Sequence, residues 1–440
     1  MQGKIIKQIE PNNIYNMDCL EGLKLLADNS IDSIVTDPPY ELGFMGKKWD
    51  STGIAYNVDL WKECLRVLKP GGHMLAFGGT RTYHRMTCAI EDAGFEIRDQ
   101  IQWLYGMGFP KNHNISKAID KKLGAKGKVI DRYKREGRSA GIMGKKVNII
   151  REVTIPMTNL AQQWDGWGTA LKPANEPICL ARKPLSEKTI ADNVLKWGTG
   201  GINIDDCRIE TDELKNKVWN NGSQRVGSGG SPTGSKEFHY SNGYVTGNSI
   251  GRFPANVILN EEAGEMLDEQ SGILKSGALK PYQEKHKNAT SYQMNRYKTF
   301  TQSANQGGAS RFFYCAKASK KERNIGLEDT VEVVRNDGRN KELDSENVPH
   351  NRGNTPKKNH HPTVKPLKLI SYLITLITPP NGISLDIFLG SGTHALACID
   401  KGFNYIGFEL EKEYFEIAQK RIEGYKEIKH NKEENYDNIL

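Results

Sequence analysis

The stretch Ser384–Thr393, which reads SLDIFLGSGT, decides the fold of this 440-residue chain. Its first residues are typical of a β-strand that ends at Asp386, and a glycine-rich turn and a helix starting near Thr393 follow. Glycines let the backbone approach a ligand closely, and the N–H groups at a helix N-terminus favour negative charge. The stretch therefore predicts a strand–turn–helix unit that binds a small molecule.

A second strand, Asn404–Phe408, leads into a carboxylate, Glu409. Glu409 lies about 20 residues beyond Asp386, the spacing that separates a nucleotide-binding turn from the acid that holds a ribose. The chain has no G-x-x-x-x-G-K-[ST] phosphate loop, and the turn is not a full G-x-G-x-x-G. The pattern indicates a nucleoside-containing cofactor.

Strands and helices alternate on both sides of a middle region of different composition. The strands are predicted at Ile31–Val35, His73–Phe77, Glu96–Leu104, Ile383–Asp386 and Asn404–Glu409. The helices are predicted at Asp59–Leu68, Thr80–Ala93, Leu367–Ile377, Thr393–Lys401 and Glu411–Tyr425. This alternation predicts an α/β fold with a doubly wound, mostly parallel sheet, in which ligands bind at the carboxyl ends of the strands.

Asp37-Pro38-Pro39-Tyr40 follows the first of these strands. The two prolines stiffen the loop and lack N–H donors, so its carbonyls are free to face a ligand. The Asp37 carboxylate and the Pro38 carbonyl suit the two hydrogens of an exocyclic amino group, and Tyr40 suits stacking on a flat base. An ordinary Asp-Pro turn after a strand is the alternative interpretation.

Together these motifs resemble those of the permuted β class of DNA amino-methyltransferases, which transfer a methyl group from S-adenosylmethionine (SAM) to adenine N6 or cytosine N4. The order is inverted, because D-P-P-Y comes before D-x-F-x-G-S-G-T. The resemblance extends to Asn16–Leu20, His361–Pro366, Tyr405–Glu409 and the Tyr414, Ala418 and Arg421 positions. It departs from the family at Ile387, usually proline, and at His394, usually a second threonine.

The resemblance implies a circularly permuted, Rossmann-like methyltransferase fold and a role for each motif residue. Asp37, Pro38, Pro39 and Tyr40 would be catalytic and would grip an adenine flipped out of duplex DNA. Asp18 would contact the adenine of SAM, and Glu409 would hold the ribose of SAM. Capping of a helix at Leu20–Leu26 is the alternative role of Asp18, and both roles are compatible. The other SAM-binding residues would be Thr363, Lys365, Asp386, Phe388, Gly390, Ser391, Gly392 and Thr393.

The resemblance also divides the chain into four parts. Residues 1–185 would be the catalytic half, 186–310 an inserted target-recognition region, 311–430 the SAM-binding half and 431–440 a polar tail. The middle region is rich in Gly, Asn and Ser, and a solvated insertion is the alternative to DNA recognition. Basic and aromatic residues interleave there at His239-Tyr240, Tyr292, Arg296-Tyr297 and Arg311–Tyr314.

Composition agrees with a DNA partner. The formal net charge is +8 and the pI is about 8.9, which favours a polyanionic partner.

No signal-like start and no apolar run of about 20 residues is present, so we expect a cytoplasmic location without a membrane partner. Seven cysteines without a C-x-x-C pair predict free thiols and no metal. A restriction endonuclease partner is consistent with the resemblance, and the oligomeric state is left open.

Two rival functions follow from the same residues. Cytosine-N4 enzymes of the family usually have serine in place of Asp37, so adenine is favoured. A DNA-binding relative that has lost SAM is the rival from another class, and RNA or protein methyltransferases rank lower because their motifs usually run in the opposite order. The absence of a Pro-Cys dipeptide argues against cytosine-C5 chemistry, which needs a cysteine nucleophile.

Overall fold

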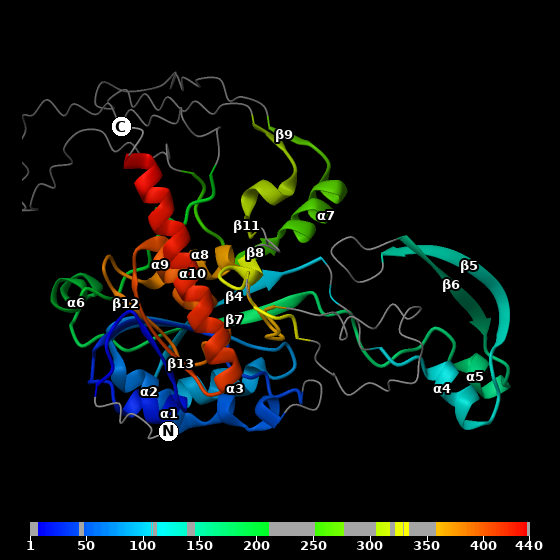
Figure 1. Cartoon of the computed structure of the whole chain (residues 1–440). Coiled ribbons are helices and arrows are strands. Elements are labelled where there is room, and N and C mark those ends of the chain that lie inside the picture. Colours follow the sequence, from blue (N-terminus) through cyan, green and yellow to red (C-terminus); the bar gives the residue numbers. More distant parts are fainter. Residues whose placement is uncertain are drawn as a thin grey trace, which may run out of the picture.

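The computed structural model describes residues 8–43, 48–106, 108, 112–138, 146–210, 251–276, 305–316, 322–328, 330–333 and 358–437. Its centre is a nine-stranded sheet (Figure 1). In spatial order the strands are β1 (Asn13–Asn16), β13 (Asn404–Glu409), β12 (Ile383–Asp386), β2 (Ile31–Thr36), β3 (Leu68–Phe77), β7 (Asn175–Arg182), β4 (Glu96–Leu104), β8 (Val257–Asn260) and β11 (Tyr314–Ala316). Only β7 among these nine described strands runs antiparallel to its neighbours. The predicted mostly parallel, Rossmann-like sheet is confirmed.

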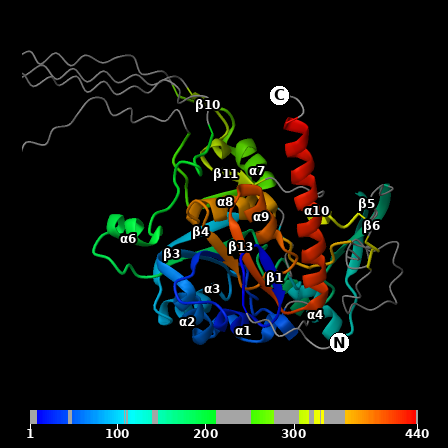
Figure 2. The same ribbon diagram turned by 60° about the vertical axis from the view of Figure 1, so that its left-hand side comes forward.

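Three helices cover each face of this sheet. One layer holds α1 (Cys19–Lys24), α2 (Val58–Val67) and α3 (Tyr83–Asp92); the other holds α8 (Leu367–Ile377), α9 (Thr393–Lys401) and α10 (Lys412–Asp437) (Figure 2). Successive side chains of a strand point to opposite faces, so Ile34 packs in the first layer and Val35 in the second. Burial on both faces explains the continuous apolar runs in the sequence.

Most predicted elements are confirmed at or near their predicted bounds. The clearest difference is in β3, which begins at Leu68, five residues before the predicted strand. α2 ends at Val67, and β3 runs through Pro70-Gly71-Gly72, where Gly71 N donates to Lys183 O and Lys183 N donates to Gly72 O. The end of β7 thus pairs with a segment that looked like a turn.

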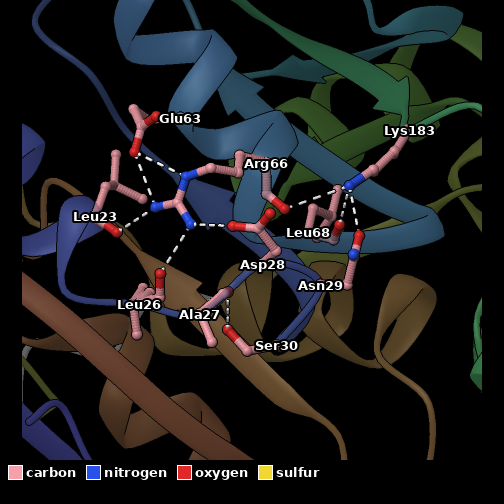
Figure 3. Close-up of polar contacts among 10 residues, drawn as sticks. All are labelled: Leu23, Leu26, Ala27, Asp28, Asn29, Ser30, Glu63, Arg66, Leu68 and Lys183. Atoms are coloured by element: carbon pink, nitrogen blue, oxygen red, sulfur yellow. Dashed lines mark hydrogen bonds and ion pairs between the residues drawn. The ribbon is translucent and has the colours of Figure 1, made fainter.

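Arg66 ties the first helix layer to the start of β2 (Figure 3). Its guanidinium donates to the carbonyl oxygens of Leu23 and Leu26 at the end of α1, at 2.8 and 2.9 Å. It also pairs with Asp28 at 2.6 Å and Glu63 at 2.9 Å. The last carbonyls of a helix need such partners. Arg66 therefore fixes the loop that leads into β2, whose other end carries Asp37.

Part of the middle region extends the central sheet. β8 pairs with β4, and β11 pairs with β8, while α7 (Glu261–Ser271) packs beside them. The short strands β9 (Leu274–Ser276) and β10 (Asn305–Gly307) pair with each other, and α6 (Ile190–Trp197) contacts β3. The motifs at 239–240, 292 and 296–297 lie outside the described residues.

A separate lobe is inserted between β4 and β7. It contains α4 (Ile115–Lys122), a long hairpin of β5 (Lys128–Arg138) and β6 (Lys146–Ile155), and α5 (Asn159–Gln163). Figure 1 shows it standing to one side of the central sheet, and among the described strands β5 and β6 pair only with each other. Nothing in the sequence indicated that this segment forms a unit of its own.

Within the described parts of the chain, no helix is both long and apolar enough to cross a membrane. All seven cysteines are free, and five of them are buried, as predicted. Burial raises the pKa of the Cys19 thiol to about 12, so it is protonated at neutral pH.

Candidate active site

The two sequence motifs meet at neighbouring strand ends. β2 and β12 are adjacent parallel strands, so Asp37 and Asp386 lie at the same edge of the sheet. Thr36 Oγ1 donates a 2.7 Å hydrogen bond to Asp386 Oδ1, which joins the end of one motif to the start of the other. Parallel pairing thus brings together two segments from opposite ends of the chain.

A cavity of about 1480 Å³ opens at this edge. Asp37–Tyr40 border it together with nine further residues proposed from the sequence. These are Asp18, Thr363, Lys365, Asp386, Phe388, Gly390, Ser391, Thr393 and Glu409. Gly392 does not border the cavity; it packs on α10, where an added Cβ would lie 3.0 Å from the Ala418 Cβ. A single cavity therefore spans both motifs.

Lys365 joins the Asp37 loop to two further side chains. Its Nζ lies 2.7 Å from Asp37 Oδ2, 3.2 Å from Glu176 Oε2 and 3.2 Å from the Tyr40 hydroxyl. The Tyr40 hydroxyl donates to Glu176 Oε2 at 2.8 Å. Asp37 Oδ1 is buried and has no hydrogen-bond partner in the described structure. The sequence resemblance placed Lys365 beside the cofactor turn, whereas here its ammonium contacts the catalytic loop.

Burial raises the pKa of Asp37 above its usual value, and the Lys365 ammonium opposes that rise. The two neighbouring carboxylates keep the pKa of Lys365 above its usual value despite burial, so the ammonium is charged at neutral pH. The cluster of Asp37, Glu176 and Lys365 therefore holds one cation between two acids.

Glu176 is a site residue that the sequence did not single out. It is the second residue of β7, whose direction is opposite to that of β2 and β3. An antiparallel strand begins at the edge where parallel strands end, so Glu176 reaches the same cavity as Asp37. In the sequence, Glu176 is an acid that precedes the apolar run Ile178–Ala181. This pattern does not show at which edge of the sheet the acid lies, because the direction of the strand is not known from the sequence.

The glycine turn is built on hydrogen bonds to two buried acids. Asp386 Oδ1 accepts from Phe388 N at 3.0 Å, and Glu409 Oε2 accepts from Gly390 N at 2.7 Å. Gly390 has φ of +56°, and an added Cβ would lie 2.9 Å from His361 Nε2. A side chain at residue 390 would thus be strained by the backbone and blocked by the His361 ring.

Burial raises the pKa of both acids to about 7. The hydrogen bonds from Thr36 and from Phe388 N to Asp386, and from Glu411 N and Gly390 N to Glu409, oppose that rise. Each carboxylate thus changes charge near neutral pH, and a ligand that donates hydrogen bonds to it favours the ionised form.

Arg421 of α10 stabilises the glycine turn through hydrogen bonds to Ser391 and Thr393. It is almost fully buried, and its guanidinium donates to the Ser391 carbonyl and hydroxyl oxygens and to Thr393 Oγ1. Burial lowers the pKa of Arg421 to about 10, so it keeps its charge at neutral pH. The turn is therefore held in shape by the protein itself.

Asp18 caps α1, because its Oδ1 accepts from Leu20 N and Glu21 N at 2.8 and 3.3 Å. The capping alternative is confirmed. Its Oδ2 accepts no hydrogen bond from the described residues, so it is available to a ligand in the cavity that Asp18 borders. Met17, Cys19, Phe408 and Leu410 form the apolar wall beside it.

The two departures from the family pattern fill buried positions. Ile387 is 1% exposed and packs in the first core layer. His394 is 3% exposed, its Nε2 lies 2.9 Å from Ser384 Oγ, and burial lowers its pKa to about 3. A neutral histidine bonded to the first residue of the motif stabilises the turn rather than adding a charge to it.

Comparison with known proteins points to one family. A family model for N6/N4 methyltransferases, described as DNA methylase, matches residues 31–420. Type II methyltransferase M.HindIII of Haemophilus influenzae is 25% identical over 233 residues, which cover 43% of this chain and 64% of the relative. Type II methyltransferase M.HpaI of Haemophilus parainfluenzae is 34% identical over 112 residues, or 23% of this chain and 35% of the relative. The putative methylase YubD of Escherichia coli K12 is 44% identical over 63 residues, or 14% and 28%.

These three alignments each span less than two thirds of the relative. Among solved structures, PvuII DNA methyltransferase (cytosine-N4-specific) has a TM-score of 0.41 at 14% identity, covering 94% of this chain and 87% of that chain. M1.HpyAVI has a TM-score of 0.35 at 16% identity, covering 93% and 98%. At these scores the structural likenesses add nothing about the chemistry.

Proposed function

Because this chain belongs to the N6/N4 DNA methylase family, we propose that it is a SAM-dependent methyltransferase that modifies adenine N6 in duplex DNA at a specific site. The observation that carries the proposal is the single cavity bordered by both Asp37–Tyr40 and the turn at Gly390. Methyl transfer needs the acceptor amine and the methyl donor in one enclosure, because alignment supplies much of the rate.

The residues around the turn fit SAM. Glu409 would accept hydrogen bonds from the ribose hydroxyls, and Asp18 Oδ2 would accept one from the adenine amino group; both residues border the cavity, which supports these roles. The same cavity is also bordered by Asp386, Phe388, Ser391, Thr393 and Thr363. When bound, SAM supplies an electrophilic methyl group. The protein contributes a turn already held in shape by Arg421.

The catalytic loop receives the base. Asp37 Oδ1 has no partner among the described residues and accepts a hydrogen bond from the amino group, while Lys365 holds Oδ2. The Pro38 carbonyl accepts the second amino hydrogen. Stacking on Tyr40, worth about 1–3 kcal/mol, offsets part of the few kcal/mol that base flipping costs. Asp37 need not be a strong base, because the methylated nitrogen loses its proton readily.

Asp37 itself favours adenine over cytosine, since cytosine-N4 enzymes of the family usually have serine there. The intact set of Asp37, Tyr40, Gly390 and Glu409 favours an active enzyme over a DNA-binding relative without SAM. We further propose a restriction–modification role, in which DNA from cells that express the chain becomes resistant to one sequence-specific nuclease.

The direct test is nucleoside mass spectrometry on unmethylated DNA incubated with the protein and SAM labelled in its methyl group. Asp37→Asn keeps the shape of the side chain and removes its charge. Asp59→Asn makes the same change on the exposed face of α2, where the carboxylate is 80% exposed, and serves as the control.

We expect labelled N6-methyladenine from the wild type and from Asp59→Asn, and a loss of at least about 100-fold with Asp37→Asn. Labelled N4-methylcytosine would overturn the base assignment and keep the fold and mechanism. No labelled nucleoside, together with no SAM binding by calorimetry, would support the non-catalytic alternative.

A further inference from the structure

The lobe between β4 and β7 is a built unit, not a loose insertion. Asp120 of α4 accepts hydrogen bonds from Met157 N, Thr158 N and Thr158 Oγ1 at 2.9, 3.1 and 2.8 Å. These bonds hold α4 against the turn between β6 and α5 and lower the pKa of Asp120. The two helices and the turn that follows the hairpin therefore have a fixed arrangement.

The base of the lobe is fastened next to the cavity. Asn112 Oδ1 accepts from Thr169 N at 2.7 Å, and His113 N donates to Thr169 Oγ1 at 2.9 Å. An added Cβ at Gly168 would lie 2.1 Å from Asn112 Oδ1, so the two chain segments touch. The segment from Thr169 to Glu176, which leads from the lobe to β7, borders the cavity. Whatever the lobe binds is held close to the cavity mouth.

The lobe is strongly basic. Residues 112–174 contain 13 lysines and arginines against five aspartates and glutamates, so this stretch alone carries a net charge as large as the +8 of the whole chain. Five exposed lysines gather on α4 and on the turn into β5, and none has an ion-pair partner in the described structure. They are Lys117, Lys121, Lys122, Lys126 and Lys128. We call them the lysine cluster.

Apolar side chains accompany this charge. Trp164 and Trp167 lie edge to face with ring centroids 5.1 Å apart, and they are 42% and 60% exposed. Met157 and Leu160 of the same lobe are also more than half exposed. Exposed apolar groups of this kind mark an interaction surface. A second copy of the lobe would bring two lysine clusters together, whereas a polyanion with flat apolar groups complements both features.

We infer that this lobe is a second DNA-binding element, distinct from the middle region, in which the lysine cluster contacts the phosphates of the duplex that flanks the target base. A duplex carries one negative charge per about 1.7 Å, and each lysine that neutralises a phosphate releases counterions. The contact is independent of base sequence and holds the duplex where a flipped base reaches the cavity. The inference rests on the proposed function for its partner, but its test does not require methylation.

The test compares two variants of the full-length protein. In one, all five residues of the lysine cluster are changed to Gln. In the matched control, five exposed lysines of the body are changed to Gln, namely Lys62, Lys188, Lys401, Lys412 and Lys420. Each variant loses five positive charges. Affinity for a labelled duplex is measured by fluorescence anisotropy between about 0.05 and 0.2 M salt.

We expect the slope of log affinity against log salt to become shallower by about 0.9 for each phosphate that the variant no longer neutralises, or about 4.5 if all five lysines bind phosphates. Wild type would then lose about 500-fold more affinity than the cluster variant over that fourfold rise in salt. The body variant should keep the wild-type slope. The effect should be equal for duplexes of unrelated sequence.

A cluster variant that matches the body variant in affinity and slope would overturn the inference, as would a change in oligomeric state without a change in DNA affinity. Unchanged SAM affinity and thermal unfolding show that each variant is folded. If the wild type binds DNA through the cluster but methylates no base, the proposed function fails and this inference stands.

Discussion

Replacing Lys365 with methionine tests the charge arrangement of the candidate site. The change keeps the length of the side chain and removes the only cation that the described structure places between Asp37 and Glu176. The Lys365 side chain is 10% exposed, and the two carboxylates are 22% and 21% exposed. The variant therefore leaves two largely buried acids facing each other without a counter-charge.

Removing one partner of a buried ion pair costs about 3–5 kcal/mol, because the other charge stays buried and unpaired. We expect Lys365→Met to lower the free energy of unfolding by that amount at pH 8. The cost should shrink at lower pH. In wild type the raised pKa of Lys365 keeps it charged below about 10.4, and its ion pair with Asp37 persists down to the pH at which Asp37 takes up a proton. In the variant the raised pKa of Asp37 rises further without the ammonium. The folded state then binds protons more tightly than the unfolded chain, and its stability falls as pH rises through the folded pKa.

The assay is urea unfolding at pH 5, 6, 7 and 8 for wild type, Lys365→Met, Glu176→Gln and the double variant. In the Glu176→Gln background only one buried acid remains, so Lys365→Met should cost less, by roughly 0.5–3 kcal/mol. A cost below about 1 kcal/mol at pH 8, or a cost that does not change with pH, would refute the ionic role of the cluster.

Three further outcomes are expected. Gly390→Ala should weaken SAM binding at least tenfold in calorimetry, because φ is +56° and the new Cβ would meet the His361 ring; an unchanged Kd would contradict the role of the turn. SAM affinity should be about tenfold lower at pH 6 than at pH 8, because the pKa of Glu409 is about 7 and a protonated Glu409 is a weaker acceptor for the ribose hydroxyls; Glu409→Gln should reduce this dependence to the part that Asp386, whose pKa is also about 7, contributes. Arg66→Met should lower the free energy of unfolding by about 2–4 kcal/mol, because the carbonyls at the end of α1 lose their partners, and urea unfolding would measure it.

The sequence predicted five of the nine described strands of the sheet and missed β1, β7, β8 and β11. The central strands were predicted because they are buried on both faces and have apolar runs. Ile31–Thr36 and Asn404–Glu409 are of this kind, and each ends in or before an acid at the ligand edge. The helices α2, α3, α8, α9 and α10 were predicted, whereas α4, α5, α6 and α7 were missed. Leu367–Ile377 has its observed bounds, and only the end of α10 runs further, to Asp437. The local pattern of apolar residues was sufficient to predict an element wherever that element buries its apolar residues in the core.

The features that the sequence did not predict depend on tertiary contacts. Glu176 belongs to the site only because β7 runs against its neighbours, and no local pattern encodes that direction. The contact of Lys365 with Asp37 joins residues from the two ends of the chain. The hairpin of β5 and β6 was missed because its strands carry charges at many positions, which hides the alternation of a half-buried strand. The roles assigned to the individual site residues remain predictions.

The pairing of β2 with β12 has a consequence for how the chain acquires its fold. Ser384 lies opposite Ser33, so the centre of the sheet is closed by strands that are synthesised long after β2. Until residues 383–409 have been synthesised, β2 has an open edge, and open strand edges pair with other chains. Contacts of such high sequence separation also slow folding.

Nascent chains that stop before β12 should therefore be sensitive to protease and prone to aggregate, although they contain the complete D-P-P-Y loop. The hydrogen bonds between these two strands, from Thr36 to Asp386 and from Ile383 N to Asp32, form only after residues 383–386 have been synthesised. Because the two motifs are far apart in the sequence, the incomplete sheet must stay soluble until β12 has been synthesised. We therefore expect folding during translation to depend on chaperones.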